Sequence, residues 1–240
     1  MNFIYLSKRK VYQLTLLSGF NKNKTDQFET IGNDYGFMIV PRNHINSDSV
    51  ILSFGVGEDI EAEIDLIGKY NCAVHLYDPT DLSVKYMAGV KQKLNSEGKS
   101  NIADKLLFTA AALWKNVGTV RFFKPKDESF VSHSINNIEA TDNFVEVPSE
   151  TIKSIMRKIN VNKVDYIKMD IEGAEYEVLD NMFEDNINFS SIYLEFHYDN
   201  NISILKNILK IRQSLKKLAE RGFEVIYCSR FRYFCLVKRN

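Results

Sequence analysis

The chain has 240 residues, of which 45% are hydrophobic and 26% are charged, a composition typical of one folded domain with a sizeable core. Lys plus Arg and Asp plus Glu balance at 31 each, so no general positive field would draw the chain to nucleic acid or to an anionic membrane. No stretch approaches the roughly 20 apolar residues of a membrane span. We expect a globular protein with no nucleic-acid partner and no stable membrane insertion.

The cysteines are few and scattered, at positions 72, 228 and 235, and they form no C-x-x-C pair. This pattern suggests neither a disulfide framework nor a zinc site, and it fits a reducing compartment. The first 20 residues carry their charges in the middle and lack a long apolar core, so we predict no signal peptide. We therefore expect a cytoplasmic protein, and the sequence leaves its oligomeric state open.

The first half of the chain predicts alternating strands and helices. The predicted elements are a helix over 1–20, a polar loop over 21–27, strands over 35–41 and 49–54, a helix over 59–70, a strand over 72–78, a helix over 83–94, and a third main strand with its exit over 105–113. The 49–54 strand is apolar throughout, as expected for a strand covered on both faces.

The second half begins with a β-rich excursion and then returns to alternation. The predicted elements are a turn and strand within 114–125, a strand over 143–148, a helix capped by Ser149, a fourth main strand from 164 that breaks into a helix at Gly173, a fifth strand over 191–199, a helix over 202–218, and a final hairpin that turns near 229–231. The hairpin connection is too short for a parallel crossover, so one of its strands must run antiparallel.

These elements predict an α/β, Rossmann-like fold, with a mostly parallel doubly wound sheet, an antiparallel strand in the C-terminal hairpin and a small β-rich insertion. This is the architecture of class I S-adenosylmethionine-dependent methyltransferases. No linker divides the chain, so we predict a single domain over 1–240. Within it, residues 1–45 form an N-terminal extension and residues 46–240 form the core.

A glycine-rich turn follows the 49–54 strand, in the stretch VILSFGVGED. Gly55 and Gly57 lie where such sheets bind a nucleotide-like cofactor, but the third glycine of a dinucleotide fingerprint is replaced by Ile60. Glu58 and Asp59 would repel a pyrophosphate, whereas they suit the cationic sulfonium and ammonium groups of S-adenosylmethionine. The alternative is that these two acids only cap the next helix.

Asp78 ends the second main strand and follows the turn by about 20 residues, the spacing of an acid that binds ribose hydroxyls. A simple turn that begins at Asp78 is the alternative. Ala111 and Ala112, at the exit of the third strand, leave room for adenine, although small residues there are also ordinary packing.

The stretch YIKMDIEGAEYEVL places Lys168, Asp170 and Glu172 on one face of the fourth strand and its extension. Three ionisable side chains on one face cost too much inside a buried strand, so they belong at its exposed end, over a site. Gly173 permits the sharp bend into the next helix. We take Lys168, Asp170 and Glu172 as catalytic candidates.

At this point the sequence resembles the FkbM family of S-adenosylmethionine-dependent methyltransferases. The matching pieces are SFGVGEDI, VHLYDPT, GTVRFF, IKMDIEGAEYEVL and LEFHYD, in that order over roughly 50–199. The resemblance implies O-methylation, often of sugar hydroxyls in surface polysaccharides or of small metabolites. It also implies that the turn entered through Ser53 and Phe54 binds the cofactor. Ser53 departs from the acid that many methyltransferases carry there, so Glu58 or Asp59 is the candidate partner of the methionine ammonium.

His197 ends the fifth strand, with Glu195 on the same face, and it joins Asp170 as a candidate base for the acceptor hydroxyl. A satisfied structural histidine is the alternative. A second route is a divalent metal on Asp170, Glu172, Glu195 and His197. The sequence does not show whether these four converge, and we favour the metal-free route.

The sequence leaves two alternatives to a methyltransferase. One is a nicotinamide-dependent oxidoreductase on a similar sheet, against which Ile60 counts. The other is a non-catalytic binding domain with the same fold, which would be expected to have lost Asp78 or Asp170; neither is lost.

Overall fold

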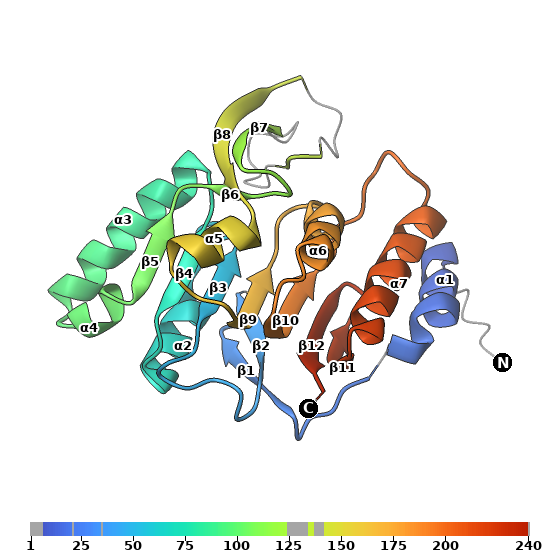
Figure 1. Cartoon of the computed structure of the whole chain (residues 1–240), viewed down its shortest axis with the longest axis horizontal. Helices are drawn as coiled ribbons and strands as arrows, with labels where there is room; N and C mark the ends of the chain where they lie inside the picture. The colour runs from blue at the N-terminus through green and yellow to red at the C-terminus, as the bar shows by residue number, and fades with distance from the viewer. Residues whose placement is uncertain (1–6, 21, 35, 124–133, 137–141, 240) are drawn as a thin grey trace.

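The structure is a computed structural model that describes residues 7–20, 22–34, 36–123, 134–136 and 142–239. Its centre is a seven-stranded sheet (Figure 1). In spatial order the strands are β11 (Phe223–Ser229), β12 (Tyr233–Lys238), β10 (Phe189–Glu195), β9 (Val164–Met169), β3 (Ile51–Phe54), β4 (Val74–Tyr77) and β5 (Leu106–Thr109).

All pairings within this sheet are parallel except the two that β12 makes, with β10 and with β11. The hairpin of β11 and β12 turns between Ser229 and Tyr233, as predicted. The predicted fold class is therefore confirmed. The strand order reverses between β3 and β9, so a crevice forms at the carboxyl ends of these two strands, where such sheets bind ligands.

Apolar clusters cover both faces of the sheet. One cluster joins the sheet to α1 (Lys8–Leu17), α5 (Ile152–Lys158), α6 (Glu175–Glu184) and α7 (Ile204–Glu220). The other joins it to α2 (Glu61–Tyr70), α3 (Asp81–Ser96), α4 (Ser100–Ala103) and a strand pair of β1 (Phe28–Gly32) and β2 (Phe37–Pro41). The main strands are apolar because both of their faces are buried in this way. Every helix in the described part of the chain is too short or too polar to cross a bilayer.

A three-stranded sheet forms the predicted β-rich insertion. It contains β6 (Ala112–Leu113), β8 (Phe144–Glu150) and β7 (Gly118–Phe123). In Figure 1 this sheet stands above the upper ends of β3, β4 and β5, on the side where the crevice opens. It thus supplies one wall of the crevice.

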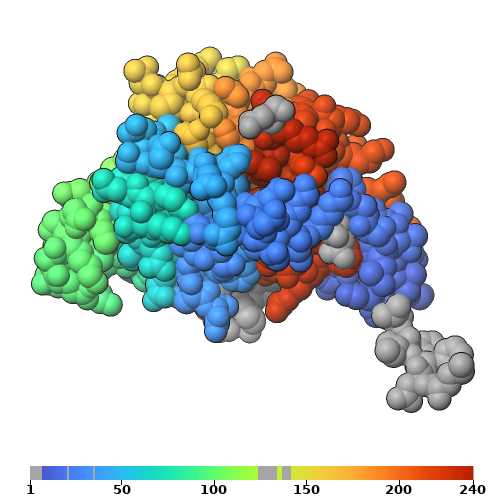
Figure 2. Space-filling view, turned by 90° about the horizontal axis from the view of Figure 1, so that it is seen from below, coloured from blue at the N-terminus to red at the C-terminus, as the bar shows by residue number. Residues whose placement is uncertain are grey.

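The N-terminal segment docks against the C-terminal hairpin. The Lys24 N–H donates to the Ile226 carbonyl at 2.8 Å, and the Cys228 N–H donates to Asn23 Oδ1 at 2.7 Å. The buried Tyr166 hydroxyl of β9 donates to the Ile39 carbonyl of β2 at 3.0 Å. Seen from below, the blue N-terminal segments lie directly beside the red C-terminal strands (Figure 2). The described residues of the extension are therefore packed against the core.

Some elements differ from the prediction in their bounds or in their caps. The short 3-10 helix η1 (Ser18–Phe20) ends the first helical segment, and β1 lies within residues for which no strand was predicted. The helix α5 is capped by Thr151, through a reciprocal pair of hydrogen bonds with Ser154, and not by Ser149. Ser149 instead continues β8, and its hydroxyl donates to the Asn116 carbonyl at 2.9 Å. The extra strand residues arise because β8 pairs with both β6 and β7.

Candidate active site

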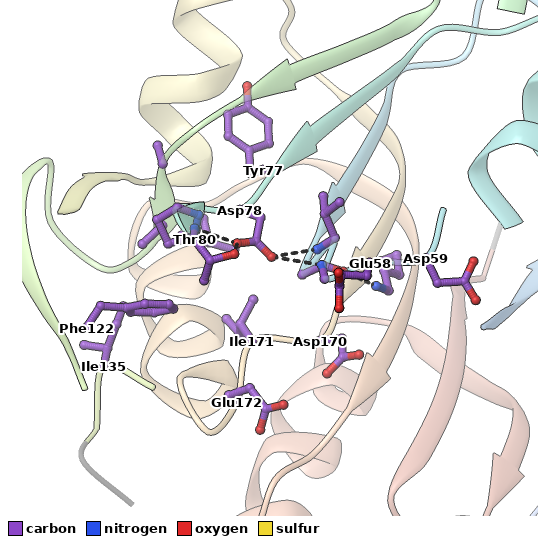
Figure 3. Close-up of a pocket in the computed structure, with 18 of the residues that line it drawn as sticks. Glu58, Asp59, Tyr77, Asp78, Thr80, Phe122, Ile135, Asp170, Ile171 and Glu172 are labelled. Carbon is purple, nitrogen blue, oxygen red and sulfur yellow. Dashed lines mark hydrogen bonds between the residues drawn. The ribbon is translucent and has the colours of Figure 1, made fainter. Parts of the chain in front are cut away.

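A cavity of about 350 Å³ lies at the carboxyl ends of β3, β4 and β9 (Figure 3). Its walls come from the glycine turn, the end of β4, the insertion sheet and the acidic turn after β9. The lining residues are Gly36, Gly55, Val56, Gly57, Glu58, Asp59, Tyr77, Asp78, Pro79, Thr80, Ala111, Ala112, Leu113, Phe122, Ile135, Lys168, Asp170, Ile171 and Glu172. The cavity therefore brings together most of the side chains predicted for the cofactor and for catalysis.

The glycine turn depends on the absence of a side chain at Gly55. This residue has a φ of 84°, and a Cβ built on it would lie 1.9 Å from the backbone oxygen of Asp170. The turn after β3 and the turn after β9 are thus in direct backbone contact, which only glycine allows. Gly57 also has a positive φ, of 55°, but a Cβ there would meet nothing within 4 Å.

Asp78 closes the glycine turn from the side of β4. Its Oδ2 accepts hydrogen bonds from the N–H groups of Val56 and Gly57, at 3.0 and 3.1 Å. Its Oδ1 accepts from the N–H and the hydroxyl of Thr80, at 2.9 and 2.7 Å. Figure 3 shows these bonds as dashed lines at the centre of the cavity. The carboxylate is therefore held in one orientation at the cavity, where it has been predicted to bind ribose.

Ser53 and Phe54, through which the chain enters the predicted cofactor turn, are not among the residues that line the cavity. Both are buried in the core, because they precede the turn and lie within β3, and Phe54 stacks on Tyr77. The Ser53 hydroxyl donates to Glu63 Oε1 of α2 at 2.6 Å. Glu63 is itself buried. A carboxylate therefore lies beside Ser53, but it comes from the next helix, α2, and not from the strand β3.

Glu58 and Asp59 both line the cavity, but their surroundings differ. Glu58 is exposed, whereas Asp59 Oδ1 accepts the Glu61 N–H at 2.9 Å, at the start of α2. This bond forms an Asx-type turn before α2, whose N-cap residue Ile60 has no side-chain cap. Figure 3 places Asp59 at the end of the cavity far from Phe122 and Ile135.

The opposite end of the cavity is apolar. Ala111 and Ala112 are both buried, and they line this end with Tyr77, Phe122 and Ile135. The sequence analysis did not identify Phe122 and Ile135, which come from the insertion. A single apolar residue in a short strand does not indicate which cavity or surface it will contact. A flat apolar ring such as adenine suits this end of the cavity.

Lys168 reaches the glycine turn. Its Nζ donates to the Gly55 carbonyl at 2.5 Å, so the side chain ties β9 to the turn after β3. A smaller cavity of about 120 Å³ adjoins the first one and shares Lys168, Asp59 and Asp170 with it. The buried Glu63 also lines this smaller cavity.

The acidic turn after β9 is organised by Glu175, the residue that sequence reasoning missed. Glu175 is fully buried, and its Oε1 accepts the N–H groups of Ile171 and Gly173 at 3.3 and 3.2 Å. Glu172 has a φ of 52°, an uncommon conformation for a residue other than glycine and one that is often found at functional sites. A signal for Glu175 did exist: it shares helical spacing with the buried Val178 and Met182.

His197 lies just beyond β10 and brings the acids together. Its Nδ1 is 2.8 Å from Glu175 Oε1. Its Nε2 lies 3.3 Å from Glu172 Oε2, 3.7 Å from Asp170 Oδ1 and 3.7 Å from Glu195 Oε1. The four residues that the sequence named as alternative metal ligands therefore do converge.

The charge states in this cluster bear on the predicted base. Burial works to lower the pKa of His197, but the surrounding carboxylates, Glu175 first, outweigh it and raise the pKa to about 10. Burial also raises the pKa of Glu195 to about 7, although His197 and Arg232 oppose the shift. The Arg232 guanidinium lies 2.6 Å from Glu195. The raised pKa favours the protonated imidazolium, which works against the predicted role of His197 as a general base.

The sequence profile of the Methyltransferase FkbM domain matches residues 32–225. The chain belongs to the FkbM methyltransferase family. The family match confirms the resemblance found in the sequence, and it begins inside the N-terminal extension, at the end of β1. It favours methyl transfer over the nicotinamide alternative.

The solved structures that resemble this chain have low sequence identity to it. A methyltransferase FkbM from Methylobacillus flagellatus KT is 15% identical over 80% of this chain and 44% of its own length, with a TM-score of 0.49. M. capricolum TrmK with S-adenosyl-homocysteine is 11% identical over 80% of this chain and 62% of its own, with a TM-score of 0.36. The N-terminal domain of human METTL16, also with that ligand, is 11% identical over 79% and 61%, with a TM-score of 0.37. The chain therefore spans 44–62% of the lengths of these three. No curated protein matches it.

Proposed function

We propose that this FkbM family protein is an O-methyltransferase that moves the methyl group of S-adenosylmethionine to a hydroxyl of a glycan precursor or a small metabolite. The observation that carries the proposal is that one cavity joins the glycine turn and Asp78 to the acids Asp170 and Glu172. The first pair suits the cofactor, and the second pair suits an acceptor that must lose a proton. The family to which the chain belongs uses S-adenosylmethionine.

The cofactor has a defined direction in this proposal. The adenine lies at the apolar end, against Ala111 and Ala112, and the ribose lies beside Asp78. Because Asp78 already accepts four hydrogen bonds, the ribose hydroxyls share its oxygens with the donors of the turn. The methionine end points to Glu58, Asp59 and the smaller cavity. Glu63 lines this smaller cavity and bonds to Ser53, so its carboxylate could take the place of the acid that many methyltransferases carry at the position of Ser53.

The reaction is an in-line displacement at carbon. The acceptor oxygen forms a bond to the methyl carbon as the carbon–sulfur bond breaks, and neutral S-adenosylhomocysteine leaves. The hydroxyl proton passes to the carboxylate of Asp170 or Glu172, both of which line the cavity. His197 and Glu175 act as positioning residues in this scheme, and Lys168 holds the glycine turn.

Two further parts of the proposal have indirect support. A cytoplasmic location fits Cys72, Cys228 and Cys235, which are all free and buried. A neutral small molecule or glycan fits the balanced charge of the chain better than a polyanion does. The two acids at the acceptor end also disfavour a phosphorylated hydroxyl.

Calorimetry with S-adenosylhomocysteine and with NAD, side by side, tests the assignment. We expect saturable binding of S-adenosylhomocysteine with a dissociation constant in the micromolar range, about −8 kcal/mol, and no heat from NAD. Binding of NAD without binding of S-adenosylhomocysteine would contradict the proposal. A panel of sugar and phenolic acceptors with labelled cofactor then identifies the class of hydroxyl.

A further inference from the structure

The convergence of Asp170, Glu172 and His197 has the shape of a metal site. These three side chains come from two adjacent strand ends, and one ligand atom from each lies within 4.8 Å of the others. A hexacoordinate divalent ion at about 2.1 Å from its ligands holds them about 3 Å apart on adjacent corners and about 4.2 Å apart across the centre. The Nε2 distances of 3.3 and 3.7 Å to the two carboxylates fall within that range.

The orientation of His197 is a second, independent indication. The residue is 7% exposed, and its Nδ1 is fixed by the hydrogen bond to the fully buried Glu175. With a proton on Nδ1 shared with Glu175, Nε2 faces carboxylate oxygens, so either a second proton or a metal ion must lie between them. Nε2 forms ion pairs with the carboxylates of Glu172, at 3.3 Å, and of Asp170, at 3.7 Å. A buried imidazole oriented by a carboxylate on its far nitrogen is the usual arrangement of a metal ligand.

We propose that Asp170, Glu172 and His197 bind a divalent cation of the Mg²⁺ and Mn²⁺ class. Two carboxylate oxygens and one imidazole nitrogen suit these ions, and the nitrogen favours Mn²⁺ over Mg²⁺. Glu175 is the positioning residue that orients His197. Glu195, 3.7 Å from Nε2 and paired with Arg232, lies at the border of the site. This proposal reverses the preference for a metal-free route that the sequence alone suggested.

The ion would have open positions on the side of the cavity, because Asp170 and Glu172 both line it. Resting on the proposed function, the ion would hold the acceptor oxygen and favour its deprotonated form. Because Asp170 and Glu172 would then bind the ion, the hydroxyl proton would pass to solvent water and not to either carboxylate. The oxygen then displaces S-adenosylhomocysteine as described above. Binding of the ion itself does not depend on methyl transfer and is measured without it.

Titration of Mn²⁺ into chelator-treated full-length protein, followed by electron paramagnetic resonance, tests the site. We expect one saturable Mn²⁺ per chain in the wild type. Glu172→Gln, which keeps the size of the side chain, should weaken binding by at least about tenfold. Glu175→Gln should weaken it by about 10–100-fold through the orientation of His197. Glu177→Gln is the matched control, since Glu177 lies on the same segment, outside the cluster, near Asn136; it should bind as the wild type does.

Absence of saturable Mn²⁺ binding to the folded wild type, or equal binding by Glu172→Gln and Glu177→Gln, would overturn the proposal. Circular dichroism of each variant separates loss of the site from loss of the fold. Calorimetry of S-adenosylhomocysteine on the same samples keeps the two proposals apart. Cofactor binding without Mn²⁺ binding removes the metal site alone, and Mn²⁺ binding without cofactor binding removes the proposed function alone.

Discussion

The two ends of the cavity are built in opposite ways. At the end near β4, the carboxylate of Asp78 accepts four hydrogen bonds from its own chain, and the remaining wall is apolar. At the end near β9, the carboxylates of Asp170 and Glu172 face a buried His197 across 3.3–3.7 Å. At the β4 end the carboxylate has its hydrogen bonds without a ligand, whereas at the β9 end several carboxylates lie close together around one imidazole.

This difference separates two tasks. Recognition of the constant part of a cofactor needs a rigid, preformed surface, because preorganisation lowers the entropy cost of binding. Chemistry on an acceptor needs charged groups that are held close together in spite of their repulsion, a strain that the rest of the fold must offset. We expect substitutions at the β4 end to change stability and cofactor affinity, and substitutions at the β9 end to change turnover.

The largest expected effect belongs to the β9 end. Asp170→Asn keeps the size of the side chain and removes one charge, and we expect methyl transfer to fall by about 10²–10⁴-fold. The melting temperature should stay close to that of the wild type, because the side chain is only partly buried and sits among other acids. Labelled methyl transfer measures the effect, with Glu177→Gln as the control. Near-normal turnover of a folded Asp170→Asn protein would remove Asp170 from the chemistry.

The backbone contact between the two ends comes next. Gly55→Ala places a Cβ against the Asp170 carbonyl and forces a positive φ on alanine, so we expect a loss of about 3 kcal/mol in the free energy of unfolding. Gly57→Ala shares only the positive φ and should cost about 1 kcal/mol. Urea unfolding of both variants measures the difference. Equal losses would show that the close approach to Asp170 does not constrain the turn.

A smaller effect is expected at the β4 end. Asp78→Ala leaves the N–H groups of Val56 and Gly57 without their acceptor, which we expect to lower stability by about 1–3 kcal/mol. Affinity for S-adenosylhomocysteine should fall by a similar amount, because the ribose also loses its acceptor. Thermal unfolding and calorimetry measure the two losses. The neighbouring Asp81→Ala, which changes an exposed acid, should cost less than about 1 kcal/mol and leave affinity unchanged.

The smallest effect concerns Ser53. Ser53→Ala removes one hydrogen bond to Glu63, and we expect a loss of about 1 kcal/mol because the adjoining small cavity admits water to that carboxylate. If Glu63 contacts the methionine end, Glu63→Gln should weaken S-adenosylhomocysteine binding more than Ser53→Ala does. Calorimetry of the two variants settles the order, and a larger loss for Ser53→Ala would restore Ser53 as the contact.

The sequence predicts the architecture well because the main strands are long apolar runs with turn residues at their ends. Their carboxyl ends then fix where Gly55, Asp78 and Asp170 gather. The short strand β1 was missed because its burial alternates little and depends on pairing with β2. The cap of α5 was misplaced by two residues, because Ser149 and Thr151 carry the same local signal and only the sheet pairing of Ser149 distinguishes them.

Within the site, the prediction fails where two segments must meet. Glu63 contacts Ser53 from the next helix, α2, and Glu175, at the start of α6, contacts His197 at the end of the neighbouring strand β10. Each of these contacts depends on the angle between a helix and a strand, which no local pattern encodes. The raised pKa of His197 is a further case, since it follows from three carboxylates whose distances the sequence does not give.

The docking of the N-terminal segment on the C-terminal hairpin orders the events of biosynthesis. Lys24 and Asn23 find their partners at Ile226 and Cys228, roughly 200 residues later, so these bonds wait until almost the whole described chain has left the ribosome. The part of β2 that packs against β12 therefore lacks this partner through most of synthesis. In pulsed hydrogen exchange during refolding, we expect the amides of β2 to become protected slowly and together. The reason is that contacts between segments far apart in the sequence require the closure of a long loop, which costs entropy. Protection of β2 before that of β12 would contradict this order.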